Sequence, residues 1–390
     1  MNLDDQTIRD LIGFTDEHGV LSFYAGHTPA QAADRQPTAP IEIRNQLKQL
    51  RARLDEAEPD LARAVASRLS NLNGALEDLV DARAPGRGRA LFVAVDSGET
   101  AEVHLQIPFR ERVVHREAAY VRPLVAALDE GREAGILVVS RGGARLLRWA
   151  TGEAVELERW QFEIPEQVLD GEKSAPPGGM DNTRGYSDRD SFDDRIDENR
   201  HRFLREVVAA STTMLEQQGW DRLVVSATPK VREVVTDLIA TDKVRVLVAE
   251  RAFEDAAPHE IADGVWYLLR SVHQQRESEL ATAARERALG GGAGALGLRH
   301  VCDALNEGRV AHLLYDDRLE LEGFVSAEGT VHPRVEGVVA TSEVALEREP
   351  WFVERLVEAA IRTSAQVTPL QPDAADQLDD HEGVAALLRW

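Results

Sequence analysis

A glycine pair inside a long polar segment is the feature of this sequence best suited to close contact with a ligand. The segment 174–182 reads SAPPGGMDN. Paired glycines such as Gly178 and Gly179 let a backbone approach a crowded ligand and adopt positive φ angles. The same residue types are common at a flexible loop tip, so the sequence leaves both interpretations open.

Acidic residues that could bind a metal follow this segment, between Asp188 and Asp197. A calcium loop starting at Asp188 would need an oxygen ligand at position 192 and a glycine at position 193, where the sequence has Phe192 and Asp193. The histidines do not form a metal-ligand motif. We therefore predict no metal site, and a solvated acidic face near a helix N-terminus is the simpler interpretation.

Cofactor and nucleophile motifs give little support to other chemistry. Gly292, Gly294 and Gly297 have G-x-G-x-x-G spacing, but a predicted helix rather than a strand precedes them. The serines lack a G-x-S-x-G setting, and the single cysteine, Cys302, lies at the apolar spacing of a predicted helix, as expected for a buried, inert thiol. The sequence thus predicts no cofactor and no hydrolase of the nucleophile type.

The charge balance limits the possible partners. The chain has 45 Lys and Arg against 68 Asp and Glu, a net charge of -23. This charge repels phosphate backbones at long range, so we expect no binding to free DNA or RNA through a broad basic face, although local basic patches could still bind a ribosome. The sequence has neither a long apolar run nor a signal peptide, so we expect a cytoplasmic protein without membrane contact.

Apolar periodicity predicts a mixed α/β N-terminal domain over residues 1–128. Its helices are expected over 4–18 and in a hairpin whose apolar positions span 47–54 and 61–79. Its strands are expected at 20–25, 90–95 and 102–107.

The middle domain, residues 129–278, should begin with an antiparallel ribbon of strands between 136 and 157. An exposed polar loop is expected over 170–190, followed by a helix that carries Ile196 and Phe203. The strand at 223–226, the helix at 231–238 and the strand at 244–248 imply a parallel pair, and a long helix is expected from 258 to 289.

In the last domain, residues 279–390, helices alternate with strands. The helices are expected at 298–306 and 351–362 and the strands at 310–315, at 365–369 and before Trp390. Such alternation predicts a small α/β/α sandwich. The whole chain is thus expected to be a multidomain protein of α/β and α+β class.

Several segments resemble the archaeo-eukaryotic class I release factor and Pelota family. The segment 198–207, ENRHRFLREV, resembles the basic amphipathic helix that follows the Gly-Gly-Gln loop in that family. The segment 135–148, GILVVSRGGARLLR, is similar to the opening hairpin of the family's middle domain, and 301–317 and 383–390 are similar to parts of its last domain. The resemblance covers roughly residues 130–390 and implies an RNase H-like middle domain. The N-terminal domain looks more like the divergent first domain of bacterial members.

The resemblance implies a role for the glycine loop. In relatives with the full motif, the glycines bring a glutamine to the peptidyl-tRNA ester in the peptidyl transferase centre, where water is positioned and the oxyanion is stabilised. Gly178 and Gly179 match the glycines, but Met180 stands in place of the glutamine. Hydrolysis of peptidyl-tRNA in ribosome rescue and non-catalytic occupation of idle ribosomes in hibernation both stay open.

The same resemblance suggests partners and contact residues. It implies binding to the A site of the ribosome, to ribosomal RNA and peptidyl-tRNA, with a translation GTPase as a further partner. The candidate RNA contacts are Arg184, Arg200, His201 and Arg205. Two alternatives from other classes remain, a metal-dependent hydrolase built on the RNase H-like domain and a non-catalytic stress scaffold.

Overall fold

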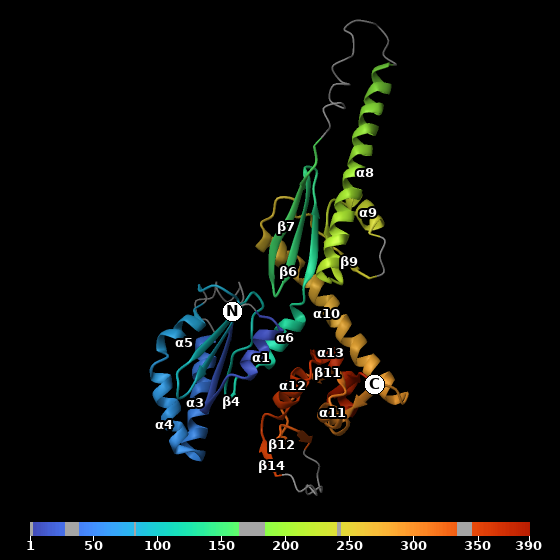
Figure 1. Ribbon diagram of the computed structural model, residues 1–390. Helices are drawn as coiled ribbons and strands as arrows, with labels where there is room; N and C mark the ends of the chain where they lie inside the picture. Colours follow the sequence, from blue (N-terminus) through green and yellow to red (C-terminus); the bar gives the residue numbers. More distant parts are fainter. Residues whose placement is uncertain (1–2, 28–38, 82, 164–183, 240–242, 334–344) are drawn as a thin grey trace. The chain divides into compact units, whose positions relative to one another are not determined.

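In the computed structural model the chain divides into two compact units (Figure 1). The described ranges are 3–27, 39–81, 83–163, 184–239, 243–333 and 345–390, and within 184–194 only the helical backbone is described. Unit 1 consists of residues 1–131 and 270–390, and unit 2 consists of residues 132–269. The sequence-based division into three domains remains a prediction.

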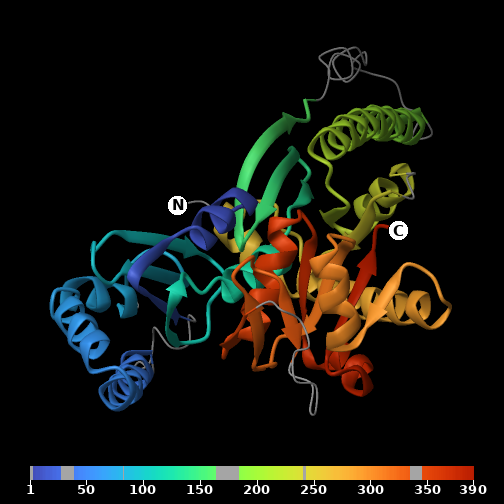
Figure 2. The ribbon, with the colours of Figure 1, turned by 60° about the horizontal axis from the view of Figure 1, so that its bottom comes forward.

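The N-terminal part of unit 1 is a four-stranded antiparallel sheet in the order β3-β2-β1-β4. The strands are β1 (Thr15–Gly26), β2 (Gly88–Ala94), β3 (Thr100–Leu105) and β4 (Arg112–Ala118). The helices are α1 (Asp5–Ile12), α3 (Ala39–Ala57), α4 (Pro59–Ser70) and α5 (Asn73–Val80). Helices α3, α4 and α5 gather on one side of this sheet in both views (Figures 1 and 2). The expected mixed α/β fold is confirmed, but the helix expected over 4–18 ends at Ile12, and residues from Thr15 onward belong to β1.

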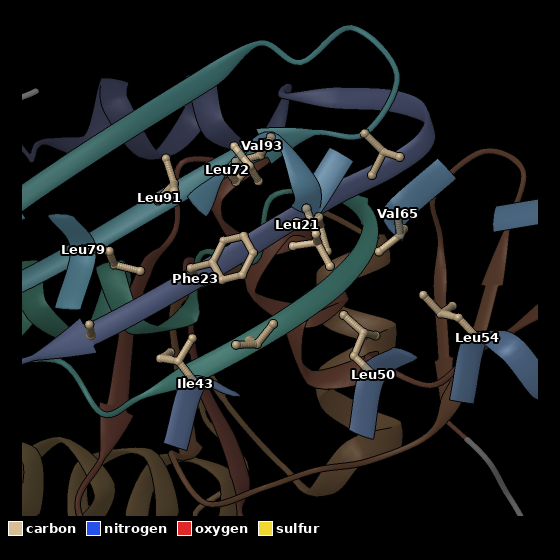
Figure 3. Close-up of a cluster of buried hydrophobic side chains, with 14 of the residues drawn as sticks. Leu21, Phe23, Ile43, Leu50, Leu54, Val65, Leu72, Leu79, Leu91 and Val93 are labelled. Atoms are coloured by element: carbon tan, nitrogen blue, oxygen red, sulfur yellow. The ribbon is translucent and has the colours of Figure 1, made fainter. Parts of the chain in front are cut away.

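Apolar side chains from these helices and from β1 and β2 form one core (Figure 3). Phe23 and Val65 are fully buried in it, and Ile43 and Leu50 from α3 are nearly so. The expected second helix of the hairpin is in fact two helices, α4 and α5, which are separated at Leu72. The weak helix formers in SNLNG, at positions 70–74, account for this break, and Leu72 still reaches the core.

Unit 2 is built on a five-stranded sheet in the order β7-β6-β5-β8-β9. The strands are β5 (Ala134–Val139), β6 (Gly143–Ala150), β7 (Glu153–Gln161), β8 (Arg222–Ser226) and β9 (Arg245–Val248). Strands β5, β6 and β7 are antiparallel neighbours, and β8 is parallel to both β5 and β9. Three antiparallel strands followed by two parallel ones, in the order 3-2-1-4-5, make the RNase H-like sheet that was expected.

Helices cover both faces of this sheet. They are α8 (Arg184–Gln218), α9 (Pro229–Leu238) and the first part of α10 (Pro258–Leu289). Helices α8 and α9 pack on the face with Leu137 and Val225, whereas α10 packs on the face with Ile136 and Val224. Helix α8 begins at Arg184, so it takes in the end of the segment that was expected to be loop up to residue 190. The polar residues there hid this start, because they have no apolar period.

The C-terminal part of unit 1 contains a second four-stranded sheet, in the order β10-β16-β11-β15, and a small sheet, β13-β12-β14. Its strands are β10 (Gly294–Leu296), β11 (Val310–Asp316), β12 (Gly323–Ser326), β13 (Val331–Pro333), β14 (Leu346–Glu349), β15 (Gln366–Leu370) and β16 (Val384–Leu388). Its helices are α11 (Gly297–Asn306), α12 (Phe352–Arg362), α13 (Pro372–Ala375) and the 3-10 helix η1 (Asp376–His381). The end of α10 and α13 pack on the face with Leu314, and α11 and α12 also contact the sheet, as expected for a small α/β/α sandwich.

Buried charged side chains and one backbone amide join the two parts of unit 1. We call this contact the junction; it is formed by the side chains of Arg116, Arg122, Glu354 and Glu358 and by the amide of Val121. Arg116 Nη1 lies 2.8 Å from Glu358 Oε1, and the Val121 amide donates to Glu354 Oε1 at 2.6 Å. Arg122 donates to two backbone carbonyls of the 317–319 turn. Burial raises the pKa of Glu354 to about 7, although the nearby Arg116 opposes this shift. The junction therefore buries a carboxyl group that can change charge near neutral pH.

Candidate functional site

The turn between β5 and β6 positions the end of β7. The Ser140 amide donates to the Gly143 carbonyl at 2.8 Å, and the Phe162 amide donates to the Gly142 carbonyl at 2.9 Å. Gly143 has a φ of +155°, and a Cβ atom at this position would lie 2.0 Å from the Trp160 carbonyl oxygen. Only glycine permits this close approach, so the turn fixes the place where the chain leaves the sheet.

An aromatic pair joins this strand end to α8. The rings of Phe162 and Phe203 lie 5.4 Å apart between centroids. The Arg200 guanidinium lies 5.3 Å from the Phe162 centroid, and its Nη2 donates to the Arg141 carbonyl at 2.9 Å. We call Arg141, Phe162, Arg200 and Phe203 the loop anchor, because they connect the residues before the 164–183 segment to the helix after it.

Gly178, Gly179 and Met180 lie outside the described residues, and so does the side chain of Arg184 at the start of α8. The other candidate RNA contacts have different environments on α8. His201 and Arg205 are exposed, whereas Arg200 is half-buried in the loop anchor. Arg200, His201 and Arg205 thus share one helix, but Arg200 turns inward, and their role as RNA contacts stays a prediction.

The exposed side of α8 also borders a shallow groove next to the end of α9. The groove has a volume of about 360 Å³. Its lining residues are Arg205, Val208, Ala209, Thr212, Thr213, Glu216 and Leu238. Both threonine hydroxyls donate to carbonyls one turn earlier in the helix, so Arg205 and Glu216 are the charged groups that remain to face a ligand.

Sequence reasoning missed Arg141, Phe162 and Phe203 as parts of a site. The available signals were the Gly142–Gly143 turn and an aromatic residue at the end of a strand. Neither signal shows which residues touch one another, because residues 141, 162 and 200 come together only when the sheet and α8 have formed.

The acidic segment does not gain support as a metal site. Asp197 is exposed, and its Oδ2 lies 3.8 Å from Lys230 Nζ; the side chains of the aspartates from 188 to 194 are outside the described residues. The two adjacent parallel strands β5 and β8 read AGILVV and RLVVS, so they provide no carboxylate at the centre of the sheet. Among the described residues, no cluster of His, Cys, Asp and Glu has the geometry to hold a metal ion.

An ion pair stabilises the ribbon near the loop anchor. Glu156 accepts hydrogen bonds from Arg159 and from the buried Arg145 of the neighbouring strand. These bonds, that from Arg159 above all, lower the pKa of Glu156. This carboxylate therefore stays ionised at neutral pH and is a structural ion-pair partner rather than a general acid.

Two further features were expected from the sequence. Cys302 is buried in α11, as expected, and burial, together with the nearby Asp303, raises its thiol pKa to about 12, so an inert thiol stays the prediction. In the parts of the chain that the structure describes, every helix is too short or too polar to cross a bilayer.

Comparison with known proteins identifies the middle of the chain. Residues 120–277 match the family model described as bacterial archaeo-eukaryotic release factor family 10. No curated protein matches the sequence.

Three solved structures to which this chain is similar come from archaea and yeast. The archaeal translation termination factor aRF1 is 15% identical, with 99% of this chain and 96% of that chain covered and a TM-score of 0.25. Archaeal Pelota, in a model of ribosome-bound Pelota and ABCE1, is 15% identical over 78% of this chain and 77% of that chain, with a TM-score of 0.41. Dom34 of S. cerevisiae, described as a translation termination-like factor, is 9% identical over 78% and 79%, with a TM-score of 0.39.

The family match spans β5 to β9, both sides of the loop anchor and most of α10. The resemblance expected from the sequence spans roughly residues 130–390, and the family model matches the first part of this range. Residues 120–277 therefore resemble the bacterial branch of the archaeo-eukaryotic release factors, and the resemblance expected from the sequence is confirmed for this part of the chain.

Proposed function

We propose that this protein is a cytoplasmic, ribosome-associated factor that binds the A site and directs the 164–183 segment at the peptidyl transferase centre. The observation that carries the proposal is the release factor match over 120–277, which includes the loop anchor on either side of Gly178 and Gly179. A translation GTPase is the proposed further partner.

The loop anchor supports this function physically. A segment that enters a crowded, RNA-lined site must be held at its base, because a loop whose ends also moved would lose more conformational freedom on binding. The Phe162–Phe203 pair and the Arg200 contacts provide such a base. The exposed His201 and Arg205 on α8 offer contacts to the RNA around it.

Two activities are compatible with this position. In the first, the backbone at Gly178 and Gly179 positions water for hydrolysis of the peptidyl-tRNA ester without a glutamine side chain. In the second, the segment occupies the site of an idle ribosome without catalysis. Met180 favours the second, because a thioether is at best a weak acceptor and donates no hydrogen bond to an oxyanion.

Ribosome co-sedimentation combined with a peptidyl-tRNA release assay tests the proposal. We expect the wild-type chain to bind ribosomes with little release, and Met180→Gln to bind equally and to gain release. Loop-dependent release by the wild-type chain, abolished in Gly178→Ala/Gly179→Ala, would instead identify a rescue factor. Failure to bind ribosomes, or metal-dependent nuclease activity that Asp190→Ala/Asp194→Ala removes, would overturn the proposal.

The role of the loop anchor can be tested separately with Arg200→Ala. Loss of this side chain removes the contacts to Phe162 and to the Arg141 carbonyl, so we expect weaker ribosome binding, by roughly 5- to 30-fold if the loss is 1–2 kcal/mol. Arg285→Ala, at an exposed position near the end of α10, is the matched control. If the two variants bind ribosomes with equal affinity, Arg200 does not position the segment.

A further inference from the structure

Helix α3 carries a row of exposed cations beside the face that packs on its core. Arg44, Lys48 and Arg51 follow one another at spacings of four and three residues, which places them along one side of the helix. The adjoining face is fixed by burial, because Ile43, Leu50 and Leu54 point into the N-terminal core (Figure 3). We call Arg44, Lys48 and Arg51 the basic stripe.

The basic stripe makes no ion pair and no hydrogen bond with any residue that the structure describes. Two acids flank the stripe on the same helix: Glu42 accepts a hydrogen bond from Gln46 at 2.9 Å, and Asp55, one turn after Arg51, forms no ion pair with it. Arg68 of α4 shows the contrast, since it donates to the carbonyls of Val95 and Asp96. The stripe therefore does not hold the fold together.

Keeping these like charges one turn apart costs about 0.2–0.5 kcal/mol per pair on a helix surface. The chain has 68 acidic residues and a net charge of -23, so partners for the stripe would have been easy to place. Uncompensated cations in such an acidic protein favour an anionic ligand, and they create an attractive patch on a surface that otherwise repels one.

The shape beside the stripe indicates which anion fits. A shallow groove of about 450 Å³ runs along α3. It is lined by Arg44, Leu47, Lys48, Arg51, Ala52 and Asp55. No aromatic ring lies in this lining on which a base could stack, so the groove suits a sugar-phosphate backbone rather than base recognition.

We propose that the basic stripe binds the phosphate backbone of RNA without reading its sequence. The stripe is about 10 Å long at a rise of ~1.5 Å per residue, so its cations are spaced along the helix and can contact separate phosphates of one backbone. This inference deepens the proposed ribosomal function, on which it rests, by giving the N-terminal part of unit 1 a contact with ribosomal RNA.

The test compares Arg44→Ala/Lys48→Ala/Arg51→Ala with the control Arg285→Ala/Arg287→Ala/Arg299→Ala, which removes the same charge from exposed positions of the C-terminal part of unit 1. Affinity for ribosomes and for a naked RNA hairpin is measured between about 50 and 200 mM salt. We expect the stripe variant to lose about 2 in the slope of log K against log salt and at least about 10-fold in affinity for both ligands. The control should keep the wild-type slope.

Alanine is the best helix former, so the stripe variant should retain α3, which its thermal unfolding would verify. An unchanged slope in the stripe variant, equal losses in both variants, or binding of anionic lipid vesicles in place of RNA would each overturn the inference. A different result would contradict the proposed function, namely that the wild-type chain does not bind ribosomes at all. If the chain then still bound the hairpin through the stripe, the RNA-binding site would be supported and the ribosomal role would not.

Discussion

Gly143 shows how one residue determines the geometry of the candidate site. Gly143→Ala would place a Cβ atom 2.0 Å from the Trp160 carbonyl oxygen, at a φ of +155° that other residues rarely adopt. We expect a loss of roughly 2–4 kcal/mol in the free energy of unfolding of unit 2 and weaker ribosome binding. Gly142→Ala is the control, since its Cβ meets no atom within 4 Å. Equal stability of the two variants in urea unfolding would contradict this account.

Cys302 gives a second prediction at the scale of single residues. Its thiol is 1% exposed, and burial raises its pKa to about 12. A thiol-alkylating reagent at pH 8 should therefore leave the native protein unmodified and react only after unfolding in urea, because the thiolate is the reactive form. Rapid alkylation of the native chain would show that α11 opens or that the thiol is reactive.

Some candidate residues could be proposed from the sequence and others could not, for one physical reason. Glycine pairs and a basic helix are local patterns, so Gly178, Gly179, His201 and Arg205 could be proposed from spacing. The partner of Arg200 is a carbonyl 59 residues away in the chain, and a contact with a backbone atom leaves no mark on residue type. Long-range contacts of this kind require the assembled sheet.

At the scale of elements, periodicity predicted those helices and strands that have a clear apolar pattern. Helix α10 runs from Pro258 to Leu289 and stops at the glycine tract, as expected. Strand β4 was missed, because RVVHREA, at 112–118, alternates poorly and owes its burial to pairing with β1. Helix α12 is also unusual, since Glu354 and Glu358 on it are as buried as its apolar residues.

The buried carboxyl group of α12 predicts a pH dependence of stability. The pKa of Glu354 is about 7 in the folded state, above the ordinary value near 4.5, so the folded state binds the proton more tightly. This contribution to stability is complete below pH ~4.5 and is lost as pH rises to about 7. Arg116, Arg122 and Glu358 are the charged groups around it, and none of them is changed in the test.

Glu354→Gln keeps the shape of the side chain but does not titrate. We expect the free energy of unfolding of the wild-type protein to fall relative to this variant by about 2 kcal/mol between pH 5 and pH 8. Urea unfolding across that range measures the difference. Glu349→Gln, which removes a mostly buried carboxylate paired with Arg355, is the control for the loss of a charge from this region. Parallel pH profiles for wild type and Glu354→Gln would exclude a raised pKa.

At the scale of the whole molecule, unit 2 is inserted into unit 1. The chain leaves unit 1 after Gly131 and returns at Arg270. The two ends of unit 1 lie close together there, since Arg270 Nε is 3.6 Å from Glu130 Oε1 and Arg276 Nη1 is 3.0 Å from Asp129 Oδ1. Local sequence patterns could not predict this connection, because the hydrogen bonds of the junction join residues 233 and 242 positions apart.

This topology predicts how the chain can be divided. Joining Gly131 to Arg270 by a short Gly/Ser linker should give a unit 1 that unfolds cooperatively, since the two ends are already neighbours. The fragment 270–390 alone should be about 3–5 kcal/mol less stable, because Glu354 and Glu358 stay on α12 but lose Arg116 and the Val121 amide. Urea unfolding of both, with fragment 132–269 as an independently folding control, tests this. If 270–390 is as stable as the linked unit, the junction contributes little and the three-domain division expected from the sequence is the correct one.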